Sequence, residues 1–399
     1  MLSTSPLKTE APGAGPRNLP ELSVVLPCLD EAATIGGCIE QVRKTLLANN
    51  ISGEIIVADN GSSDNSCHIA EALGASVVAV ANRGYGSALM GGIAAARGKY
   101  IVMGDADGSY DFSQIPLFLD RLRSGYELVM GNRFQGGIEP GAMSPLHHYF
   151  GNPVLTGIGR LLFKVPCHDF HCGLRGFTRI AYDRMQLRTT GMEFASEMVV
   201  KASLFKLPVC EVPTTLSPDG RHRRSHLRSW HDGWRHLRFL LLYSPRWLFF
   251  YPGVTLLLAG VVTGLWLLFN PSRVGPIQLD VHALLYATLG ILAGFQTVLF
   301  AFFAKVFGVT EGLLPEDPRL TRAFRILNLE KGLLIGSTLL AVGMGTSAYT
   351  LYVWNRTGFD AMDPVVLVRL LAAVIILITL GVEIICASFF LSILGITRK

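Results

Sequence analysis

Four long apolar stretches in the second half of the chain set the strongest limit on its fold. They lie near residues 249–269, 284–306, 333–354 and 365–394, and each is long enough to cross a bilayer. Half of the residues are hydrophobic and only 16% are charged, and this apolar excess begins after about residue 239. Buried core helices are the alternative interpretation, but four such stretches with short polar joints favour membrane spans. We therefore predict an α-helical transmembrane domain with four spans over residues 249–399.

The distribution of Lys and Arg predicts how the spans are oriented. Five of these residues lie between positions 305 and 331, at the joint after the second stretch, whereas the first and third joints carry one Arg each. Because Lys and Arg concentrate on the cytoplasmic side of membrane proteins, we expect the domain before the first span to be cytoplasmic. Residues 1–20 are rich in Pro, Ala, Gly and Ser, so we interpret them as a flexible tail rather than a signal peptide.

Residues 22–134 alternate strand patterns with helix patterns. Apolar runs predict strands at 22–26, 54–58, 76–81, 100–103 and 127–130, and helical spacing predicts helices at 31–49, 65–73, 86–97 and 117–124. This alternation indicates an α/β domain with a mainly parallel sheet that is covered on both faces. Ligands of such sheets bind beyond the carboxyl ends of the strands. We therefore expect a ligand site at that edge, within a domain at residues 21–228.

Two aspartates, Asp105 and Asp107, follow the fourth predicted strand. Residues two apart along a strand point the same way, so we expect the two carboxylates to project together while Ala106 faces the sheet. Two hard oxygen ligands suit Mg²⁺ or Mn²⁺ that carries a diphosphate. A solvated turn without a ligand is the plainer interpretation of the same residues.

Other special residues lie just past the remaining strand ends. They are Pro27, Asp59, Asn82 and Asn132. Asp59 could simply shape a turn, and Gly84-Tyr85-Gly86 could punctuate a loop rather than cradle an anion at a helix N-terminus. Because parallel strands end at one edge of a sheet, the whole set favours a site for an activated nucleotide.

Five motifs resemble the family-two glycosyltransferases of the GT-A fold. The motifs are LPCLDE at 26–31, ADNGSSD at 58–64, NRGYG at 82–86, DADG at 105–108 and GNRF at 131–134. Within that family, residues 22–245 are similar to the polyprenyl-phosphate hexosyltransferases, the dolichol-phosphate mannose and glucose synthase group. The resemblance implies a Rossmann-like GT-A domain. It also implies an inverting, metal-dependent transfer of glucose or mannose from a UDP- or GDP-linked donor to a polyprenyl or dolichyl phosphate at the cytoplasmic membrane face.

The same resemblance implies roles for individual residues. Contacts with the nucleotide sugar are expected from Pro27, Leu29, Glu31, Asp59, Arg83, Gly84, Gly86, Asp105 and Ala106. Asp105 and Asp107 would bind Mg²⁺ or Mn²⁺, and the catalytic residues would be Asp107, Arg133 and Arg175. Two positions depart from the family pattern. Ser109 stands where members often have a metal-ligating Gln, and Asn60 stands where many have a second Asp.

The expected acceptor, a lipid phosphate, is already anionic at pH 7, so the site needs cations more than a strong base. Arg133 and Arg175 are candidates for binding its phosphate in a bidentate manner. Arg223 and Arg224 are further candidates, in a run rich in Arg, His and Trp before the first span. We interpret residues 229–248 as an interfacial segment that attracts anionic headgroups. An ordinary surface Arg and a basic membrane anchor are the plainer alternatives.

Three further features have more than one interpretation. Glu193 and Glu197 lie four apart on a predicted helix, where Glu197 could orient the sugar or an Arg, or form an ion pair. Glu383 lies in the fourth apolar stretch and is either functional or interfacial. Cys167 and Cys172 lie in a loop with two histidines, which we interpret as a free-thiol loop rather than a zinc site. No segment resembles a nucleic-acid module, and a homo-oligomer is possible.

Two other functions fit part of the pattern. A processive polysaccharide synthase also joins this fold to membrane spans, but Tyr243 stands three residues before Arg246 where such enzymes have Gln. A lipid transporter or flippase with a regulatory nucleotide-binding domain is the alternative of another class. The spans show neither an inverted repeat nor paired broken helices, so an anchoring role for them is simpler.

Overall fold

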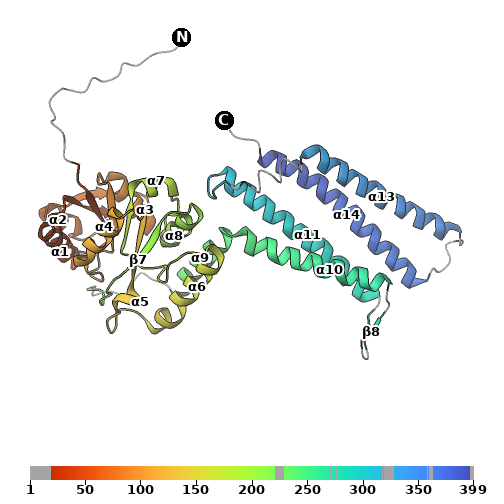
Figure 1. Cartoon of the computed structure of the whole chain (residues 1–399), viewed down its shortest axis with the longest axis horizontal. Coiled ribbons are helices and arrows are strands. Elements are labelled where there is room, and N and C mark those ends of the chain that lie inside the picture. The colour runs from red at the N-terminus through yellow and green to blue at the C-terminus, as the bar shows by residue number, and fades with distance from the viewer. Residues whose placement is uncertain are drawn as a thin grey trace, which may run out of the picture. The chain divides into compact units, whose positions relative to one another are not determined.

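The computed structural model describes residues 19–220, 229–269, 272–274, 277–279, 281–316, 318, 328–356, 358 and 363–395. The chain divides into two compact units, Met1–Arg160 with Lys164–His236, and Leu161–Phe163 with Leu237–Lys399. The first unit is an α/β domain and the second consists mainly of long helices (Figure 1). The predicted order of an α/β domain followed by a helical domain is therefore confirmed.

The α/β unit contains a seven-stranded sheet with the order β3-β2-β1-β4-β6-β5-β7. The strands are β1 Leu22–Cys28, β2 Gly53–Asp59, β3 Ser76–Ala79, β4 Tyr100–Met103, β5 Leu128–Asn132, β6 Arg175–Thr178 and β7 Val209–Pro213. Neighbouring strands are parallel except where β6 pairs with β4 and β5. The mainly parallel sheet is thus confirmed, and all five strands predicted between residues 22 and 134 are present.

Burial on both faces explains why the apolar runs form strands. Every residue of β4 is buried, and β1 is buried except at Pro27, as in a parallel sheet with helices on both sides. α1 packs against α2 and α4, and α3 packs against α8. The helices of this part of the chain are α1 Ile35–Ala48, α2 Ser66–Ala72, α3 Tyr85–Ala95, α4 Ile115–Arg123, α5 Arg133–Gly136, α6 Asn152–Phe163, α7 Arg179–Met185, α8 Phe194–Leu204 and α9 Ser229–Leu242.

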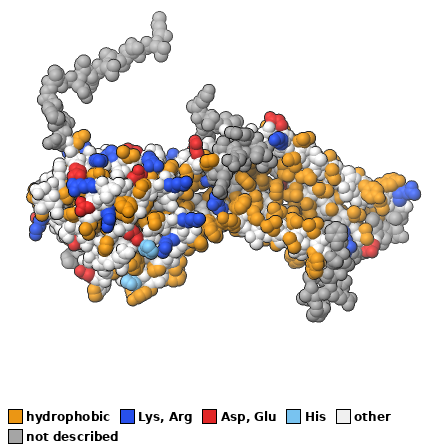
Figure 2. All heavy atoms as spheres, in the orientation of Figure 1, with side chains coloured by type: hydrophobic (Ala, Val, Ile, Leu, Met, Phe, Trp, Pro, Cys, Tyr) orange, Lys and Arg blue, Asp and Glu red, His pale blue; other side chains and the backbone are white. Residues whose placement is uncertain are grey.

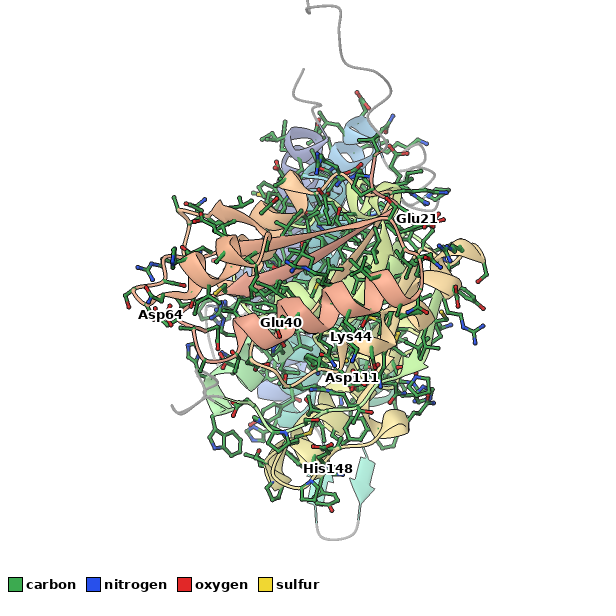
Figure 3. All side chains as sticks on the ribbon, turned by 90° about the vertical axis from the view of Figure 1, so that its left-hand side faces the viewer. Glu21, Glu40, Lys44, Asp64, Asp111 and His148 are labelled. Carbon is green, nitrogen blue, oxygen red and sulfur yellow. The ribbon has the colours of Figure 1, made fainter. Side chains whose placement is uncertain are left out.

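The first helix shows how the predicted periodicity is used. The residues of its apolar stripe are all buried, and they are Ile35, Ile39, Val42 and Leu46. Glu40 and Lys44 lie on the exposed face of the same helix (Figure 3). Gln41 Nε2 donates to Asp111 Oδ1 at 2.7 Å, which ties α1 to the short 3₁₀ turn η1 Phe112–Gln114. One face of the helix therefore belongs to the core and the other to solvent.

The second unit is dominated by four long helices. They are α10 Tyr251–Phe269, α11 Val281–Thr310, α13 Leu329–Arg356 and α14 Pro364–Leu394, with the two-stranded ribbon β8 Ser272–Val274 and β9 Ile277–Leu279 between the first two. The segments long and apolar enough to cross a membrane are Arg246–Leu267, His282–Thr310, Leu329–Arg356 and Val366–Leu394. Figure 2 shows hydrophobic side chains over the outside of these helices, where Leu258 and Val262 are exposed. The four predicted spans are confirmed, and the chain is a membrane protein.

Close glycine contacts join these helices in pairs. A Cβ on Gly260 of α10 would lie 2.7 Å from the Ala287 carbonyl oxygen of α11. A Cβ on Gly336 of α13 would lie 2.8 Å from the Gly381 carbonyl oxygen of α14. Small residues let transmembrane helices approach backbone to backbone, so each pair packs through its glycines.

Candidate active site

The carboxyl ends of β1, β2 and β4 bring the predicted motifs to one edge of the sheet. In the sheet register, Cys28 at the end of β1 lies opposite Asp59 at the end of β2. Thr34 Oγ1, just before α1, donates to the Ala106 carbonyl oxygen after β4 at 2.7 Å. The turns after these three strands therefore form one continuous rim, as the parallel topology predicts.

Asp105 and Asp107 lie in the turn that follows β4, which we call the carboxylate turn (residues 104–109). Both residues lie beyond the end of β4, so the expectation that strand alternation orients the carboxylates is wrong, and hydrogen bonds orient them instead. Tyr85 Oη donates to Asp105 Oδ1 at 2.9 Å. Ser109 donates to Asp107 Oδ1 from its backbone N at 3.0 Å and from its Oγ at 2.6 Å. Ala106 between them is buried in the core, as expected.

The donor set of the carboxylate turn fits a divalent cation that also binds a diphosphate. Mg²⁺ usually takes one or two protein carboxylates and completes its shell with phosphate oxygens and water. Two aspartates match that pattern, and the described residues contain no cluster of three metal-ligating side chains. At the position of the family's Gln, the Ser109 hydroxyl supports Asp107 by a hydrogen bond.

Asp59 shapes the turn after β2. Its Oδ2 accepts the Gly61 backbone N–H at 3.1 Å, and its Oδ1 accepts that of Ser62 at 3.0 Å. Burial raises the pKa of Asp59, but the hydrogen bonds from Ser62 and Gly61 outweigh burial and leave the pKa below its ordinary value. The turn-shaping interpretation therefore describes contacts that are present, and a nucleotide contact by Asp59 stays a prediction.

The hydrogen bonds of Asn60 explain why an amide stands where many family members have a second Asp. Its Nδ2 donates to the carbonyl oxygens of Val80 at 3.1 Å and Asn82 at 2.8 Å, while its Oδ1 accepts the Gly84 backbone N–H at 2.7 Å. An ionised Asp has no donor, so it could not make the first two bonds. The amide thus connects the turn after β2 to the loop after β3.

Three more residues expected at the nucleotide lie at the end of β1: Pro27 is within the strand rather than past its end, and Leu29 and Glu31 lie in the turn that follows. Pro27 and Leu29 are half-buried and Glu31 is buried. The Glu31 backbone N–H donates to Ser66 Oγ at 2.8 Å, which links this turn to the start of α2. Ser66 Oγ also donates to Asp64, so the turns after β1 and β2 share one hydrogen-bond network.

Gly84 and Gly86, which follow β3, allow another segment of backbone to pack closely against them. Gly84 has a φ of 130°, and a Cβ on Gly84 or Gly86 would overlap a carbonyl oxygen of the Thr189–Thr190 segment. The Ser87 backbone N–H donates to the Thr190 carbonyl oxygen at 3.1 Å. A carbonyl group therefore already binds the first turn of α3, where the anion cradle was expected. Arg83 in the same loop is exposed.

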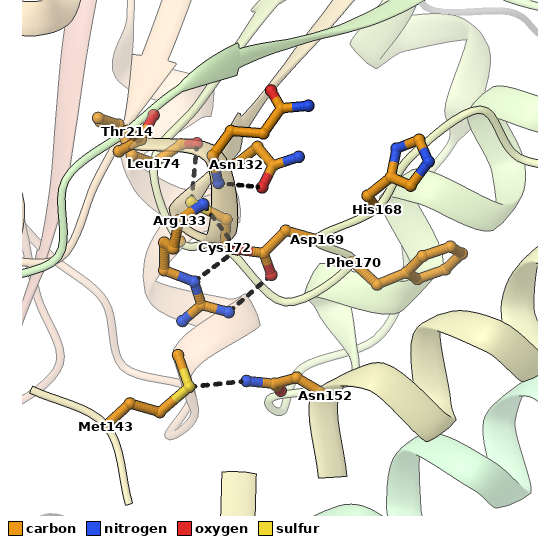
Figure 4. Close-up of polar contacts among 12 residues, drawn as sticks. Asn132, Arg133, Met143, Asn152, His168, Asp169, Phe170, Cys172, Leu174 and Thr214 are labelled. Carbon is orange, nitrogen blue, oxygen red and sulfur yellow. Dashed lines mark hydrogen bonds and ion pairs between the residues drawn. The ribbon is translucent and has the colours of Figure 1, made fainter. Parts of the chain in front are cut away.

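Arg133 forms a buried, bidentate ion pair with Asp169 (Figure 4). Its Nε and Nη2 each donate to a carboxylate oxygen at 2.7 Å. Burial lowers the pKa of the Arg133 guanidinium, but Tyr110 and Asp169 outweigh burial and raise this pKa above its ordinary value. Asp169 thus engages one edge of the guanidinium, and phosphate binding by Arg133 stays a prediction.

Arg175, predicted to bind the acceptor phosphate and to take part in catalysis, is engaged by backbone carbonyl groups, and its predicted role stays a prediction. Arg175 is fully buried at the start of β6. Its Nε donates to the Cys172 carbonyl oxygen at 2.7 Å, its Nη1 to that of Ala195 at 2.6 Å and its Nη2 to that of Phe170 at 2.9 Å. All three guanidinium nitrogens therefore bind backbone, and Arg175 fixes the loop before β6. We call Arg133, Asp169 and Arg175 the arginine cluster.

Helix α8 carries an enclosed ion pair. Glu197 Oε1 and Lys201 Nζ lie 2.8 Å apart, and both side chains are fully buried. Glu197 Oε2 accepts the backbone N–H groups of Arg188 at 3.0 Å and Thr189 at 2.8 Å. Burial raises the pKa of Glu197, but hydrogen bonds from Lys201 and Thr189 outweigh it and lower the pKa. Of the interpretations left open for Glu197, the ion pair is the one that the structure contains.

The sequence patterns missed a pair of enclosed histidines. The ring centroids of His171 and His236 lie 4.6 Å apart at an interplanar angle of 74°, and His236 Nδ1 lies 2.9 Å from Ser196 Oγ. Burial lowers the pKa of His236 to about 4 and that of His171 well below its ordinary value. On the same helix as His236, Arg235 pairs with Glu193 at 2.7 Å. The two histidines lie on distant segments, so no spacing in the sequence could have indicated their contact.

The other predicted features are placed as follows. Arg223 and Arg224 lie outside the described residues. Glu383 lies within α14, and its Oε2 is enclosed without a hydrogen-bond partner among the described residues. None of the seven cysteines forms a disulfide, and the free-thiol interpretation of Cys167 and Cys172 stays a prediction.

Two family models match the chain. The model described as "Glycosyl transferase family 2" matches residues 23–185. The model described as "Glycosyltransferase family 2 C-terminal transmembrane region" matches residues 302–395. One match therefore covers most of the sheet with its rim, and the other covers the last two spans with the end of α11.

Similar proteins come from an archaeon and a bacterium. The low-salt glycan biosynthesis hexosyltransferase Agl6 of Haloferax volcanii is 39% identical over 378 residues, which are 94% of this chain and 89% of the relative. The dolichyl-phosphate hexose transferase of the same organism is 27% identical over 194 residues, 48% of this chain and 81% of the relative. A crystal structure of glucosyl-3-phosphoglycerate synthase from Mycobacterium tuberculosis, in complex with Mn²⁺, UDP and glucosyl-3-phosphoglycerate, is 22% identical with a TM-score of 0.43, over 56% of this chain and 78% of that chain.

Proposed function

Because the chain belongs to glycosyltransferase family 2, we propose that it transfers glucose or mannose from a UDP- or GDP-linked donor to a polyprenyl or dolichyl phosphate, with inversion. The hexosyltransferase that aligns with 94% of the chain supports a hexose as the transferred group. The dolichyl-phosphate hexose transferase among the relatives supports a polyprenyl phosphate as the acceptor.

The observation that carries this proposal is the carboxylate turn. Tyr85 and Ser109 hold Asp105 and Asp107 at the edge where parallel sheets bind their ligands. We assign Mg²⁺ or Mn²⁺ to these two carboxylates, and the cation supplies positive charge that stabilises the departing diphosphate. The proposed nucleotide-sugar contacts along the same rim are Pro27, Leu29, Glu31, Asp59, Arg83, Gly84, Gly86, Asp105 and Ala106.

The acceptor needs positioning more than activation. Its phosphate is already a nucleophilic anion at neutral pH, and a direct displacement at the anomeric carbon inverts the configuration. Arg133, Arg223 and Arg224 are the proposed cations for this phosphate. We leave Arg175 out of the proposed set, because its guanidinium nitrogens bind backbone carbonyl groups.

The proposed domain order follows from these roles. We propose a tail at 1–20, a catalytic GT-A domain at 21–228, an interfacial segment at 229–248 and a transmembrane domain at 249–399. Trp230 and Trp234 of α9 are 79% and 58% exposed, which supports a place for this helix at a membrane surface, where Trp is favoured. The excess of Lys and Arg near the end of the second span supports a cytoplasmic catalytic domain.

The proposal is tested by one assay with purified full-length protein. UDP-glucose or GDP-mannose is incubated with undecaprenyl or dolichyl phosphate and Mg²⁺ or Mn²⁺, and the lipid product is identified by mass and anomeric configuration. We expect one lipid-linked hexose of inverted configuration. A retained configuration, a long polymer, or lipid translocation without any sugar transfer would overturn the proposal.

A further inference from the structure

Three charged side chains are buried on or beside helix α8. Arg175, Glu197 and Lys201 are each fully enclosed. Burying charges is costly, and replacing them by apolar side chains is often neutral or stabilising. Their contacts lead by two separate routes to the same carboxylate of the carboxylate turn.

The first route runs from Glu197 to the loop before α3. Glu197 Oε2 accepts the Thr189 backbone N–H at 2.8 Å and the Thr189 Oγ1 hydroxyl at 2.7 Å. The Thr189–Thr190 segment held in this way lies against Gly84 and Gly86, where no side chain would fit. Tyr85 stands between these glycines, so the ion pair on α8 fixes the backbone from which Tyr85 projects.

Tyr85 then contacts the carboxylate turn directly. Its hydroxyl donates to Asp105 Oδ1 at 2.9 Å. An ionised carboxylate has no hydrogen to donate, so the Tyr85 hydroxyl is the donor in this bond.

The second route runs from Arg175 to the other carboxylate oxygen of Asp105, Oδ2. Arg175 joins the Phe170 and Cys172 carbonyl oxygens to that of Ala195 on α8. The loop fixed in this way carries Gly173, where a Cβ would lie 2.5 Å from Asp105 Oδ2. The backbone at Gly173 therefore limits where the Asp105 carboxylate can rotate.

We propose that Tyr85 and Gly173 are positioning residues that fix the Asp105 carboxylate in its cation-binding orientation, and that α8 holds both through Glu197 and Arg175. This inference rests on the proposed metal-dependent transfer. In this view, the buried charges on and beside α8 hold the metal-binding carboxylate in place before the cation binds. Partners that orient a metal ligand typically change metal affinity or activity by about 10–100-fold.

The test compares Tyr85→Phe with the parent, using purified full-length protein in lipid nanodiscs. Mn²⁺ binding is measured without donor or acceptor, by electron paramagnetic resonance of the free ion. We expect Tyr85→Phe to weaken Mn²⁺ binding about tenfold, to raise the Mn²⁺ concentration needed for half-maximal activity by a similar factor, and to leave the KM for lipid phosphate and the thermal midpoint unchanged. Tyr182→Phe is the matched control, because Tyr182 stacks on Phe177 away from the rim.

Gly173→Ala supplies a second variant, which approaches the other oxygen of the Asp105 carboxylate. Its added methyl group should displace Asp105 and weaken Mn²⁺ binding at least as strongly. Gly157→Ala on α6 is its control, because a Cβ there meets no atom within 4 Å. Parent-like Mn²⁺ binding and kinetics in Tyr85→Phe would overturn the inference, as would weaker binding that is fully explained by a lower thermal midpoint.

Failure of the metal assignment gives a different result. A parent that binds no Mn²⁺ and transfers sugar without it contradicts the metal role in the proposed function. The positioning inference is then judged on the donor. Tyr85→Phe must still raise the KM for the nucleotide sugar about fivefold or more, and an unchanged donor KM overturns it.

Discussion

The carboxylate turn follows β4, and the arginine cluster lies where β5 ends and β6 begins. Both contain residues predicted to be catalytic, yet the two regions differ in how their polar groups are used. Asp105 and Asp107 accept hydrogen bonds from Tyr85 and Ser109, and a carboxylate held by such bonds can still bind a cation. The guanidinium of Arg175 instead donates to backbone carbonyls from all three nitrogens. A residue in a family motif therefore indicates a binding site only when its polar atoms are not all engaged by other groups of the same chain.

The largest expected effect comes from breaking the carboxylate turn. Asp107→Ala should lower kcat/KM for sugar transfer by about 10³-fold or more, because charge stabilisation by a cation contributes several kcal/mol to the transition state. The readout is the rate of lipid-linked hexose formation. The thermal midpoint should stay near that of the parent, and a variant with more than a tenth of parental activity contradicts the assignment.

Breaking the arginine cluster should instead lower the stability of the domain. Asp169→Asn leaves the buried Arg133 charge without its partner, which typically costs about 3–5 kcal/mol. For a domain of this size we expect a fall of about 10 °C in the thermal midpoint, measured by differential scanning fluorimetry.

The control for this variant is Asp120→Asn. Asp120 is 69% exposed and lies 3.5 Å from Arg123, and such surface pairs contribute little. Equal thermal midpoints for the two variants would show that the buried pair is no more important than the surface one.

Acid should lower the free energy of unfolding through His236, whose ring contacts His171 in the loop between Asp169 and Arg175. Its pKa is about 4 in the folded chain against an ordinary value of 6.5. Above pH 6.5 the His236 imidazole is neutral in both the folded and the unfolded chain, so its contribution to stability does not change with pH. As the pH falls from 6.5 towards 4, the unfolded chain gains a proton that the folded chain does not, so folding loses up to about 3 kcal/mol. His236→Gln should flatten the thermal midpoint over this pH range, and a parent-like slope in the variant would refute the assignment.

The smallest expected effect concerns the support of Asp107. Ser109→Ala removes a 2.6 Å hydrogen bond to the Asp107 carboxylate and should lower kcat/KM about fivefold, corresponding to about 1 kcal/mol. Ser113→Ala at an exposed position of η1 is the control. Identical rates for the two variants would show that the hydroxyl of Ser109 does not support the turn.

The sequence predicts the fold where one short segment is sufficient to define an element. The apolar run of β4 and the stripe of α1 need no knowledge of other segments. β6 has the sequence RGFT, which contains no apolar run, so only its pairing with β4 and β5 makes it a strand. This tertiary contact overrides local preference.

The candidate site also has a part that local motifs predict and a part that depends on contacts between distant segments. The motifs identified the rim, because the ends of parallel strands share one edge. They could not show that the Arg175 guanidinium faces carbonyl oxygens, since this depends on how the loop at Phe170–Cys172 folds back. Nor could they show that Thr190 caps the first turn of α3, because the two segments are distant in sequence.

The position of β6 between β4 and β5 has a consequence for biosynthesis. β4 begins at Tyr100, but its neighbour in the sheet is complete only at Thr178. At about 5–20 residues per second, a ribosome needs roughly 4–16 s to make the intervening chain. During that interval the buried edge of β4 has no strand beside it on that side, and exposed strand edges promote aggregation. The nascent chain is therefore expected to depend on chaperones most strongly in this window, before the first membrane span has been made.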